Sequence, residues 1–294
     1  MASNSNGHRV MKKLLICDLD NTLYDWVSYF VPSFYAMIDQ ATKILECDRD
    51  QLLDDFKHVH QRHHDSEHPF ALLETQTVKL RYPDKSRKQL AAIFDPAFHA
   101  FNSERKNRLE LYPDVRESLD RLSVAGIKVV AHTEGKLYSV LDRLRRLDLF
   151  DDFSRIYCRE RSYISHVRPE VGRRWLNEFP MEKVVELSHH QRKPSPDVLE
   201  EICRREGVAP EESVYVGDSV ARDVMMAKQV GVHAVWAKYG TYSSSEDYSS
   251  LVRVTHWTED DVEREKKLKQ MSASIEPDYV LEKSFSEILC CFVL

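Results

Sequence analysis

The hydrophobic positions along the chain fall into two alternating patterns. Short apolar runs that read as buried strands stand at residues 14–16, 127–131, 213–216, 232–236 and 279–281. Amphipathic helix patterns separate the later runs and begin near Val115, Asp197 and Asp223. Strands that alternate with helices predict right-handed crossovers and a parallel sheet covered on both faces. The pattern therefore predicts an α/β fold with a doubly wound, Rossmann-like core.

A long segment after the first predicted strand reads as helix throughout. Apolar residues from Trp26 to Leu45 recur at steps of three and four, as on one face of an amphipathic helix. Further helices are predicted at about residues 50–64, 69–80, 86–94 and 96–107. We therefore predict a helical cap domain, residues 25–109, inserted into a catalytic core of residues 10–24 and 110–294.

Two polar, charged stretches interrupt the core pattern, near residues 159–182 and 243–274. The first is interpreted as a surface excursion. Within the second, residues 242–248 read as a mobile loop and residues 259–271 as a solvated helix rich in Lys and Glu. The segment between Thr133 and Lys193 is long, and two runs within it, at 155–158 and 184–187, compete for the third core position.

Residues that carry chemistry stand where the predicted strands end. Asp18 and Asp20 follow the first strand, and Thr133 ends the second. Because the carboxyl ends of parallel strands meet at the edge where α/β sheets bind ligands, we expect these side chains to lie together. Taken alone, the first pair has another reading, in which Asp20 or Asn21 caps the next helix.

Three further polar residues belong to the same predicted edge. Lys193 precedes the helix that starts near Pro196, and Asp218 and Asp223 follow the strand at 213–216. Carboxylates can hold a hard cation, while an ammonium and a hydroxyl can hold phosphate oxygens. An aspartate can also form a covalent bond to phosphorus. The combination suits phosphoryl transfer.

These four segments, in this order, resemble the motifs of the haloacid dehalogenase-like superfamily, in the branch with a helical cap inserted after the first strand. The similarity runs from about Leu14 to the end of the chain. It implies that Asp18 is the catalytic nucleophile and Asp20 the general acid and base. It also implies that Thr133 and Lys193 bind the phosphate group.

The same resemblance implies a Mg²⁺ cofactor. Asp18, Asp218 and the backbone carbonyl of Asp20 would bind the metal, and Asp223 would support the metal site. The expected reaction is hydrolysis of a small phosphorylated metabolite, such as a nucleotide or sugar phosphate, through an aspartyl-phosphate intermediate. Asp20 favours phosphatase chemistry over dehalogenation, because a halide leaving group needs no acid. A phosphomutase, another enzyme with a specialised cap, and a non-catalytic binding protein remain the alternatives.

One position departs from the pattern of the superfamily. Glu134 follows Thr133 where the superfamily usually has Asn, and its charge would repel a bound phosphate if it were desolvated and unpaired. Three interpretations stay open. Glu134 points away from the site, pairs with Arg222, or marks an unusual substrate.

Histidines cluster in the predicted cap. His60, His64 and His68 have the spacing of one helix face, as zinc ligands can, but neither Cys nor carboxylate completes such a site. A polar cap surface is the simpler interpretation. Since the core residues contact groups that all phosphate esters share, we predict that His60, His63 and His64 help to choose the substrate.

Composition excludes several other classes of protein. The 294 residues carry a net charge of −6, which gives no basic footprint for nucleic acid. No apolar run approaches membrane-spanning length, so no membrane association is expected. The six scattered cysteines lack CxxC spacing and indicate reduced thiols of a cytoplasmic protein. The ending Cys291–Leu294 formally fits a prenylation box, although it also continues the apolar face of a final helix from Phe285. Oligomeric state stays open.

Overall fold

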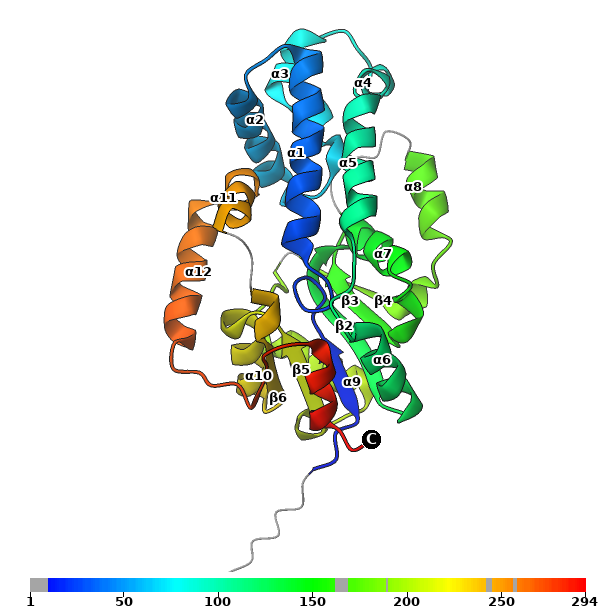
Figure 1. Ribbon diagram of the computed structural model, residues 1–294, viewed down its shortest axis with the longest axis vertical. Helices are drawn as coiled ribbons and strands as arrows, with labels where there is room; N and C mark the ends of the chain where they lie inside the picture. The colour runs from blue at the N-terminus through cyan, green and yellow to red at the C-terminus, as the bar shows by residue number, and fades with distance from the viewer. Residues whose placement is uncertain (1–9, 162–168, 189, 242–244, 256–257) are drawn as a thin grey trace, which may run out of the picture.

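The computed structural model describes residues 10–161, 169–188, 190–241, 245–255 and 258–294 (Figure 1). Its centre is a seven-stranded sheet in the order β4-β3-β2-β1-β5-β6-β7, in which every neighbouring pair is parallel. The strands are β1 (Leu14–Cys17), β2 (Lys128–Lys136), β3 (Arg155–Arg159), β4 (Val184–Leu187), β5 (Ser213–Gly217), β6 (His233–Ala237) and β7 (Tyr279–Leu281). The predicted doubly wound α/β core is confirmed.

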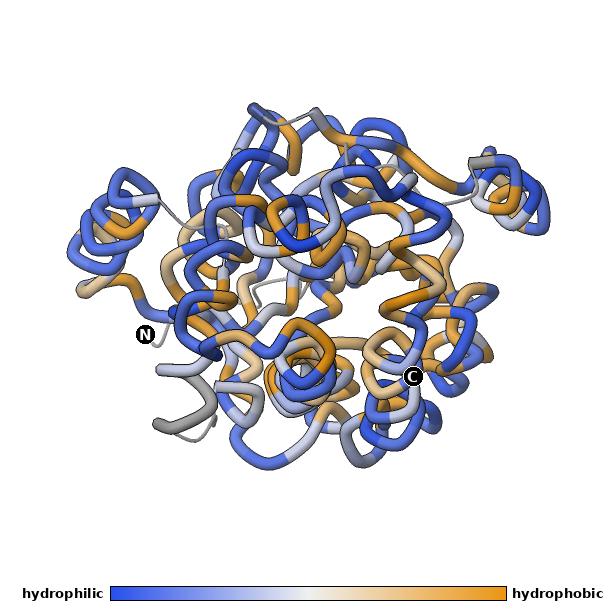
Figure 2. The backbone as a smooth tube through the Cα atoms, turned by 90° about the horizontal axis from the view of Figure 1, so that it is seen from above, coloured by the Kyte–Doolittle hydropathy of each residue, from blue (hydrophilic) through white to orange (hydrophobic). Residues whose placement is uncertain are grey.

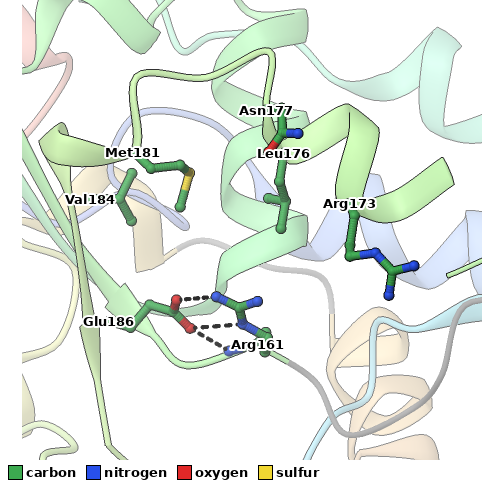
Figure 3. Close-up of a pocket in the computed structure, with 7 residues that line it drawn as sticks. All are labelled: Arg161, Arg173, Leu176, Asn177, Met181, Val184 and Glu186. Atoms are coloured by element: carbon green, nitrogen blue, oxygen red, sulfur yellow. Dashed lines mark hydrogen bonds and ion pairs between the residues drawn. The ribbon is translucent and has the colours of Figure 1, made fainter. Parts of the chain in front are cut away.

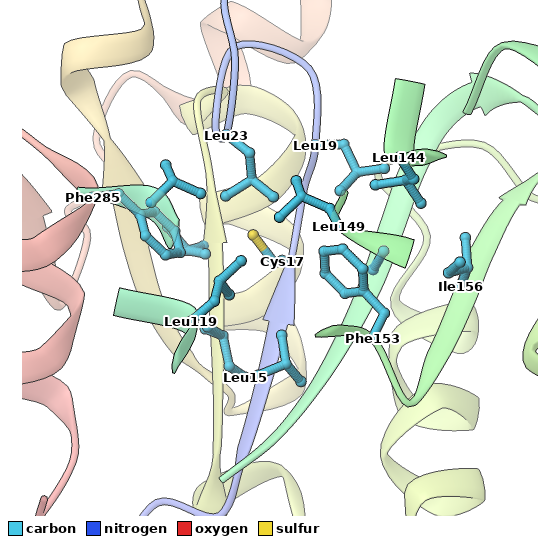
Figure 4. Packing of buried hydrophobic residues seen from close by; sticks show 14 of the residues in the cluster. Leu15, Cys17, Leu19, Leu23, Leu119, Leu144, Leu149, Phe153, Ile156 and Phe285 are labelled. Carbon is cyan, nitrogen blue, oxygen red and sulfur yellow. The ribbon is translucent and has the colours of Figure 1, made fainter. Parts of the chain in front are cut away.

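Helices cover both faces of the sheet. The core helices are α6 (Val115–Val124), α7 (Leu137–Arg146), α8 (Pro169–Leu176), α9 (Pro196–Glu206) and α10 (Met225–Val230). Alternate residues of a strand point to opposite faces. Accordingly, Leu15 and Cys17 of β1 pack with α6, α7 and the 3₁₀ segment η7 (Phe285–Cys291) (Figure 4), whereas Leu14 and Ile16 pack with α9 and α10.

The segment between β1 and β2 is helical, and the name cap denotes residues 25–109. It contains α1 (Trp26–Leu45), α2 (Arg49–His63), α3 (Gln76–Arg81), α4 (Arg87–Ile93) and α5 (Asp95–Arg108), with the 3₁₀ helix η1 (Pro69–Glu74) between α2 and α3. These helices share a hydrophobic cluster that is separate from the clusters of the sheet. Asp25 caps the N-terminus of α1, because its side chain accepts a hydrogen bond from the Ser28 backbone nitrogen at 2.9 Å.

The two runs that compete for the third core position are both strands. β3 lies beside β2, and β4 adds a further strand at the edge of the sheet. The first polar stretch contains α8, and residues 162–168 lie outside the described residues. The predicted helix over 69–80 is divided into η1 and α3, and the final helix is the 3₁₀ segment η7 (Phe285–Cys291).

The second polar stretch holds two helices, α11 (Ser245–Val254) and α12 (Glu259–Ser272). The loop predicted over 242–248 is therefore wrong from Ser245 onward, while residues 242–244 lie outside the described part. α12 lies at the periphery of the molecule (Figure 1), and hydrophilic residues predominate along the outlying helices (Figure 2). No helix among the described residues has the length and apolar character needed to cross a bilayer.

The final segment packs against the sheet. Cys291 and Phe292 are buried in the cluster that contains Leu15 and Phe285. This agrees with the interpretation of the C-terminal residues as the apolar face of a last element, although that element is 3₁₀ rather than α-helical.

Candidate functional site

Asp18 leaves β1 at the carboxyl edge of the sheet. Its backbone nitrogen donates to the Val216 carbonyl of β5 at 2.9 Å, which continues the pairing of the two strands. Asn21 then adopts a left-handed conformation, with φ 58°, and its side chain accepts from the Trp26 backbone nitrogen at 3.1 Å. A tight turn therefore carries the chain from β1 into α1, and Asp18 and Asp20 lie within it.

Lys193 joins the carboxylates of two motifs. Its Nζ donates to Asp18 Oδ1 at 2.7 Å and to Asp223 Oδ1 at 2.9 Å, with only 3% of its side chain exposed. Burial disfavours the ammonium, yet Asp18 and Asp223 hold the pKa of Lys193 well above its usual value. The structure thus brings together residues from the segment after β1, from the segment before α9 and from the segment after β5.

Three carboxylates form a group with the arrangement of a metal site. One oxygen from each of Asp18, Asp218 and Asp223 lies within 4.8 Å of the others. Burial raises the pKa of Asp18 well above its ordinary value, although Lys193 opposes the shift. Burial, followed by repulsion from Asp223, raises the pKa of Asp218 to about 7. Oxygen donors with a surplus of negative charge fit a hard divalent cation such as Mg²⁺.

Asp223 already has several partners within this group. Its Oδ2 accepts from the Ser219 backbone nitrogen at 3.1 Å, and its Oδ1 lies 3.3 Å from the Tyr215 hydroxyl. It also pairs with Lys193. These contacts leave Asp18 and Asp218 as the more available carboxylates, in keeping with a supporting role for Asp223.

Two glycines allow the chain to close around the site. A Cβ at Gly217 would lie 2.4 Å from the carboxyl group of Asp223. A Cβ at Gly240, in the turn after β6, would lie 1.6 Å from the carbonyl oxygen of Asn21. Neither position accepts a side chain without movement of the site. Trp236 of β6 adds a further contact, since its indole nitrogen donates to the Asp218 carbonyl at 2.9 Å.

Thr133 lies at the same edge of the sheet as Asp18. Cys17 of β1 is paired with Ala131 of β2, so Asp18 stands one residue and Thr133 two residues beyond the same register pair. The Thr133 side chain is buried, and its hydroxyl accepts from the Gly135 backbone nitrogen at 3.1 Å.

Glu134 links the motifs instead of standing unpaired. Its Oε1 accepts from the Lys193 backbone nitrogen at 3.0 Å, and its Oε2 lies 3.3 Å from Nη1 of Arg159. Arg222, the partner suggested by the sequence, pairs with Glu265 of α12 at 2.6 Å and also interacts electrostatically with Glu134. Arg159 compensates the charge of Glu134. The hydrogen bond from the Lys193 backbone nitrogen lets Glu134 hold the segment that carries Lys193.

Sequence reasoning missed the residues that surround Asp20. The Tyr24 hydroxyl donates to Asp20 Oδ1 at 2.7 Å, and Arg143 Nη2 lies 3.2 Å from that oxygen. Arg143 also pairs with Glu67 of the cap. One feature of the sequence indicates that Arg143 is buried. It lies three residues after Val140 and four before Leu147, so it occupies the apolar face of α7.

The histidines of the cap do not join the carboxylate cluster. His60 is fully buried, its Nδ1 lies 2.6 Å from the Val254 carbonyl, and its ring packs against Phe34 and Phe56. This position does not support substrate contact by His60, and it indicates a packing role. His63 Nε2 lies 2.8 Å from Glu74, and His64 ends α2 in a left-handed conformation.

A cavity of about 620 Å³ lies elsewhere, between α8, β4 and the segment after β3 (Figure 3). Arg161 and Glu186 form an ion pair of 2.6 Å on its wall, and Arg173 of α8 is a further lining residue. None of the predicted site residues lines this cavity. It is separate from the candidate active site.

The fold and the site together define an enzyme of the doubly wound α/β class, with a buried aspartate–lysine centre suited to phosphoryl transfer. The chain belongs to the haloacid dehalogenase-like hydrolases, whose sequence profile matches residues 12–231. The family and the enzyme class predicted from the motifs, a hydrolase with phosphatase relatives, are confirmed.

Individual relatives include two kinds of phosphatase and one dehalogenase. A glyceraldehyde 3-phosphate phosphatase of Methanopyrus kandleri is 28% identical over 242 residues, which cover 80% of this chain and 88% of that protein. A phosphoglycolate phosphatase of Vibrio vulnificus is 26% identical over 245 residues, covering 81% and 88%. The crystal structure of a 2-haloacid dehalogenase from Pseudomonas syringae superposes with a TM-score of 0.58, at 19% identity, over 96% of this chain and 98% of that one. This last similarity concerns the fold alone.

Proposed function

We propose that the protein is a Mg²⁺-dependent phosphatase that hydrolyses a phosphate monoester of a small metabolite through an aspartyl-phosphate intermediate. The observation that carries the proposal is the contact of Lys193 with both Asp18 and Asp223, beside the carboxylate group that Asp218 completes. The phosphatases among the relatives support it.

Asp18 is proposed as the nucleophile of the first step. Lys193 holds one of its carboxylate oxygens and leaves the other available. A new bond forms between this oxygen and phosphorus while the bond from phosphorus to the ester oxygen breaks. Asp20 gives its proton to the departing oxygen, so the alcohol leaves neutral.

The second step regenerates the enzyme. Asp20, now a carboxylate, takes a proton from water as the water oxygen bonds to phosphorus. The bond from phosphorus to the Asp18 oxygen breaks, and inorganic phosphate leaves. Lys193 and Thr133 are proposed to hold the phosphate oxygens in both steps. When bound by Asp18 and Asp218, with the Asp20 backbone carbonyl, Mg²⁺ would neutralise charge on the phosphoryl group.

The charge of the site supports the need for a cation. Because burial raises the pKa of Asp18, its ionised form requires nearby positive charge, and Lys193 is shared with Asp223. The substrate is proposed to be small. Substrate choice is assigned to the cap, with His63 and His64 as remaining candidates. The free cysteines among the described residues agree with a reducing, cytoplasmic setting.

A substrate screen tests the proposal. Purified protein with Mg²⁺ is incubated with phosphoglycolate, glyceraldehyde 3-phosphate, sugar phosphates and nucleotides, and released inorganic phosphate is measured. Release from at least one ester, abolished in Asp18→Asn, is expected. Conversion of a sugar phosphate to its isomer without phosphate release would indicate a mutase. A folded protein that processes no ester would contradict the proposal.

A further inference from the structure

Arg143 of α7 is fully buried, with 0% of its surface exposed, and it contacts Asp20 directly. Its Nη2 lies 3.2 Å from Asp20 Oδ1 and 3.3 Å from Oδ2. Its Nε donates to the Tyr24 hydroxyl at 2.9 Å, and its Nη1 pairs with Glu67 of the cap. A single guanidinium therefore connects the proposed general acid, the tyrosine beside it and the cap.

We propose that Arg143 is a positioning residue for Asp20, and that Glu67 of the cap holds Arg143 in the orientation this requires. The inference rests on the proposed function, because it concerns the general acid of that reaction. Arg143 contacts no reacting atom and acts through Asp20.

The contacts fix the direction of the Asp20 carboxyl group. The terminal torsion of an aspartate is broad, so an isolated carboxyl group samples many orientations. Tyr24 donates to one oxygen of Asp20, and Arg143 reaches both. Arg143 also orients the Tyr24 hydroxyl, since its Nε donates to that oxygen. Loss of the guanidinium would therefore remove one of the two groups that hold Asp20 and would leave the other, the Tyr24 hydroxyl, without its own donor.

The planar shape of the guanidinium suits Arg143 to hold Asp20 and the cap at the same time. Its donors diverge in a fixed plane, so one side reaches Asp20 and Tyr24 while the other reaches Glu67. Here two carboxylates, one at the site and one in the cap, share it.

The cap supplies Glu67 from a defined turn between α2 and η1. The Glu67 backbone nitrogen donates to Asp65 Oδ1 at 3.0 Å, and Asp65 is itself buried. The neighbouring residue of α7 offers a matched comparison. Asp142 pairs with Arg105 of α5, so it forms a second ion pair between α7 and the cap that involves no contact with Asp20.

A misplaced general acid lowers the hydrolysis rate of some substrates more than that of others. An alkyl phosphate has a poor leaving group, which needs a proton as the ester bond breaks, whereas the nitrophenolate of p-nitrophenyl phosphate leaves without one. General acid help contributes about 10²-fold or more for the first kind of ester. Damage to the fold or to phosphate binding would lower both rates together.

The test compares kcat/KM for phosphoglycolate, or the alkyl phosphate hydrolysed fastest, with that for p-nitrophenyl phosphate, both with Mg²⁺. The main variant is the double substitution Arg143→Gln with Glu67→Gln, which avoids leaving the cap carboxylate unpaired. We expect a loss of about 100-fold for the alkyl ester and less than about 3-fold for the aryl ester. Glu67→Gln alone should act in the same direction, by about 10-fold.

Controls separate positioning from folding. Asp142→Asn breaks the neighbouring ion pair with the cap and should leave the ratio of the two kcat/KM values unchanged. Thermal unfolding verifies that each variant is folded. If the double variant does not fold, the ratio of the two kcat/KM values is measured for Glu67→Gln and for Arg143→Lys instead. The lysine keeps the charge but loses the donor to Tyr24.

Equal losses on both esters in a folded variant, or no loss on either, would overturn the inference while leaving the proposed function intact. A folded wild-type protein that hydrolyses neither ester would refute the proposed function and this inference with it.

Discussion

Substitution of Asp218 by Asn should stabilise the protein in the absence of metal while abolishing its response to Mg²⁺. Asp218 lies within the group that Asp18 and Asp223 form, and burial together with repulsion from Asp223 raises its pKa from 3.8 to about 7. Above that pH the folded protein carries an unfavourable charge, which the uncharged amide removes while keeping the shape of the side chain.

The magnitude follows from linkage between protonation and folding. A rise of the pKa from 3.8 to about 7 corresponds to about 4 kcal/mol at most. Asp218 is partly exposed, so water screens its repulsion, and we expect about 1–3 kcal/mol. A carboxyl group whose pKa rises on folding contributes most to stability below its unfolded pKa, and this contribution is lost as the pH rises toward 7. The gain in stability from Asp218→Asn should therefore reach its full size near pH 8.

Thermal unfolding at pH 8 measures the prediction, first with EDTA and then with Mg²⁺. In EDTA the Asp218→Asn protein should melt about 2–10 °C above the wild type. Mg²⁺ should raise the melting temperature of the wild type, because a ligand of the folded state stabilises it. The variant should gain much less.

A carboxylate outside the site provides the control. Asp151 has a side chain that is 94% exposed, so Asp151→Asn should change neither melting temperature nor the response to Mg²⁺. An Asp218→Asn protein that melts below the wild type in EDTA, or that gains as much from Mg²⁺, would show that the three carboxylates do not share a cation site.

Three further predictions concern single residues. Asp18→Asn should lower turnover to about 1% or less, because an amide cannot form the acyl phosphate; steady-state phosphate release checks this, and a variant that keeps more than a few per cent contradicts it. His60→Ala should lower the free energy of unfolding by about 2–4 kcal/mol, since it empties the packing against Phe34 and leaves the Val254 carbonyl unpaired. Denaturant unfolding measures that loss, and a changed ratio of kcat/KM between two substrates at unchanged stability would restore the substrate-contact hypothesis. Gly217→Ala should reduce kcat, because its Cβ would displace the Asp223 carboxyl group; wild-type kcat would show that the site tolerates that shift.

The positions of Asp18, Thr133, Lys193 and Asp218 could be predicted because local patterns determine them. Each follows an apolar run or precedes a helix, and the carboxyl ends of parallel strands converge at one edge of the sheet. The roles assigned to these residues remain proposals. The competition for the third core strand could not be resolved, since both runs are strands and composition does not reveal their order in a sheet.

The residues around Asp20 could not be predicted, because their contacts join distant parts of the chain. Arg143 lies 123 residues after Asp20 and stands in a helix with two other arginines. Its apolar neighbours Val140 and Leu144 indicate burial but name no partner. The contact of Glu134 with Arg159 was not predicted, for a similar reason. Arg159 stands 25 residues after Glu134, and the pairing of β2 with β3 brings the two side chains together.

The second polar stretch shows most clearly where hydropathy fails. In α11, Leu251 and Val254 join the hydrophobic cluster of the cap. In α12, Arg264 donates to the Lys193 carbonyl at 3.0 Å, and Glu265 pairs with Arg222.

One charged segment therefore contacts both the cap and the segments that carry Lys193 and Asp223. Its charges read as solvated because hydropathy detects burial against apolar groups only. A helix whose charges meet other charges at a functional site has the same pattern as one whose charges meet water. The two cases are distinguished by the partners, which belong to other parts of the chain.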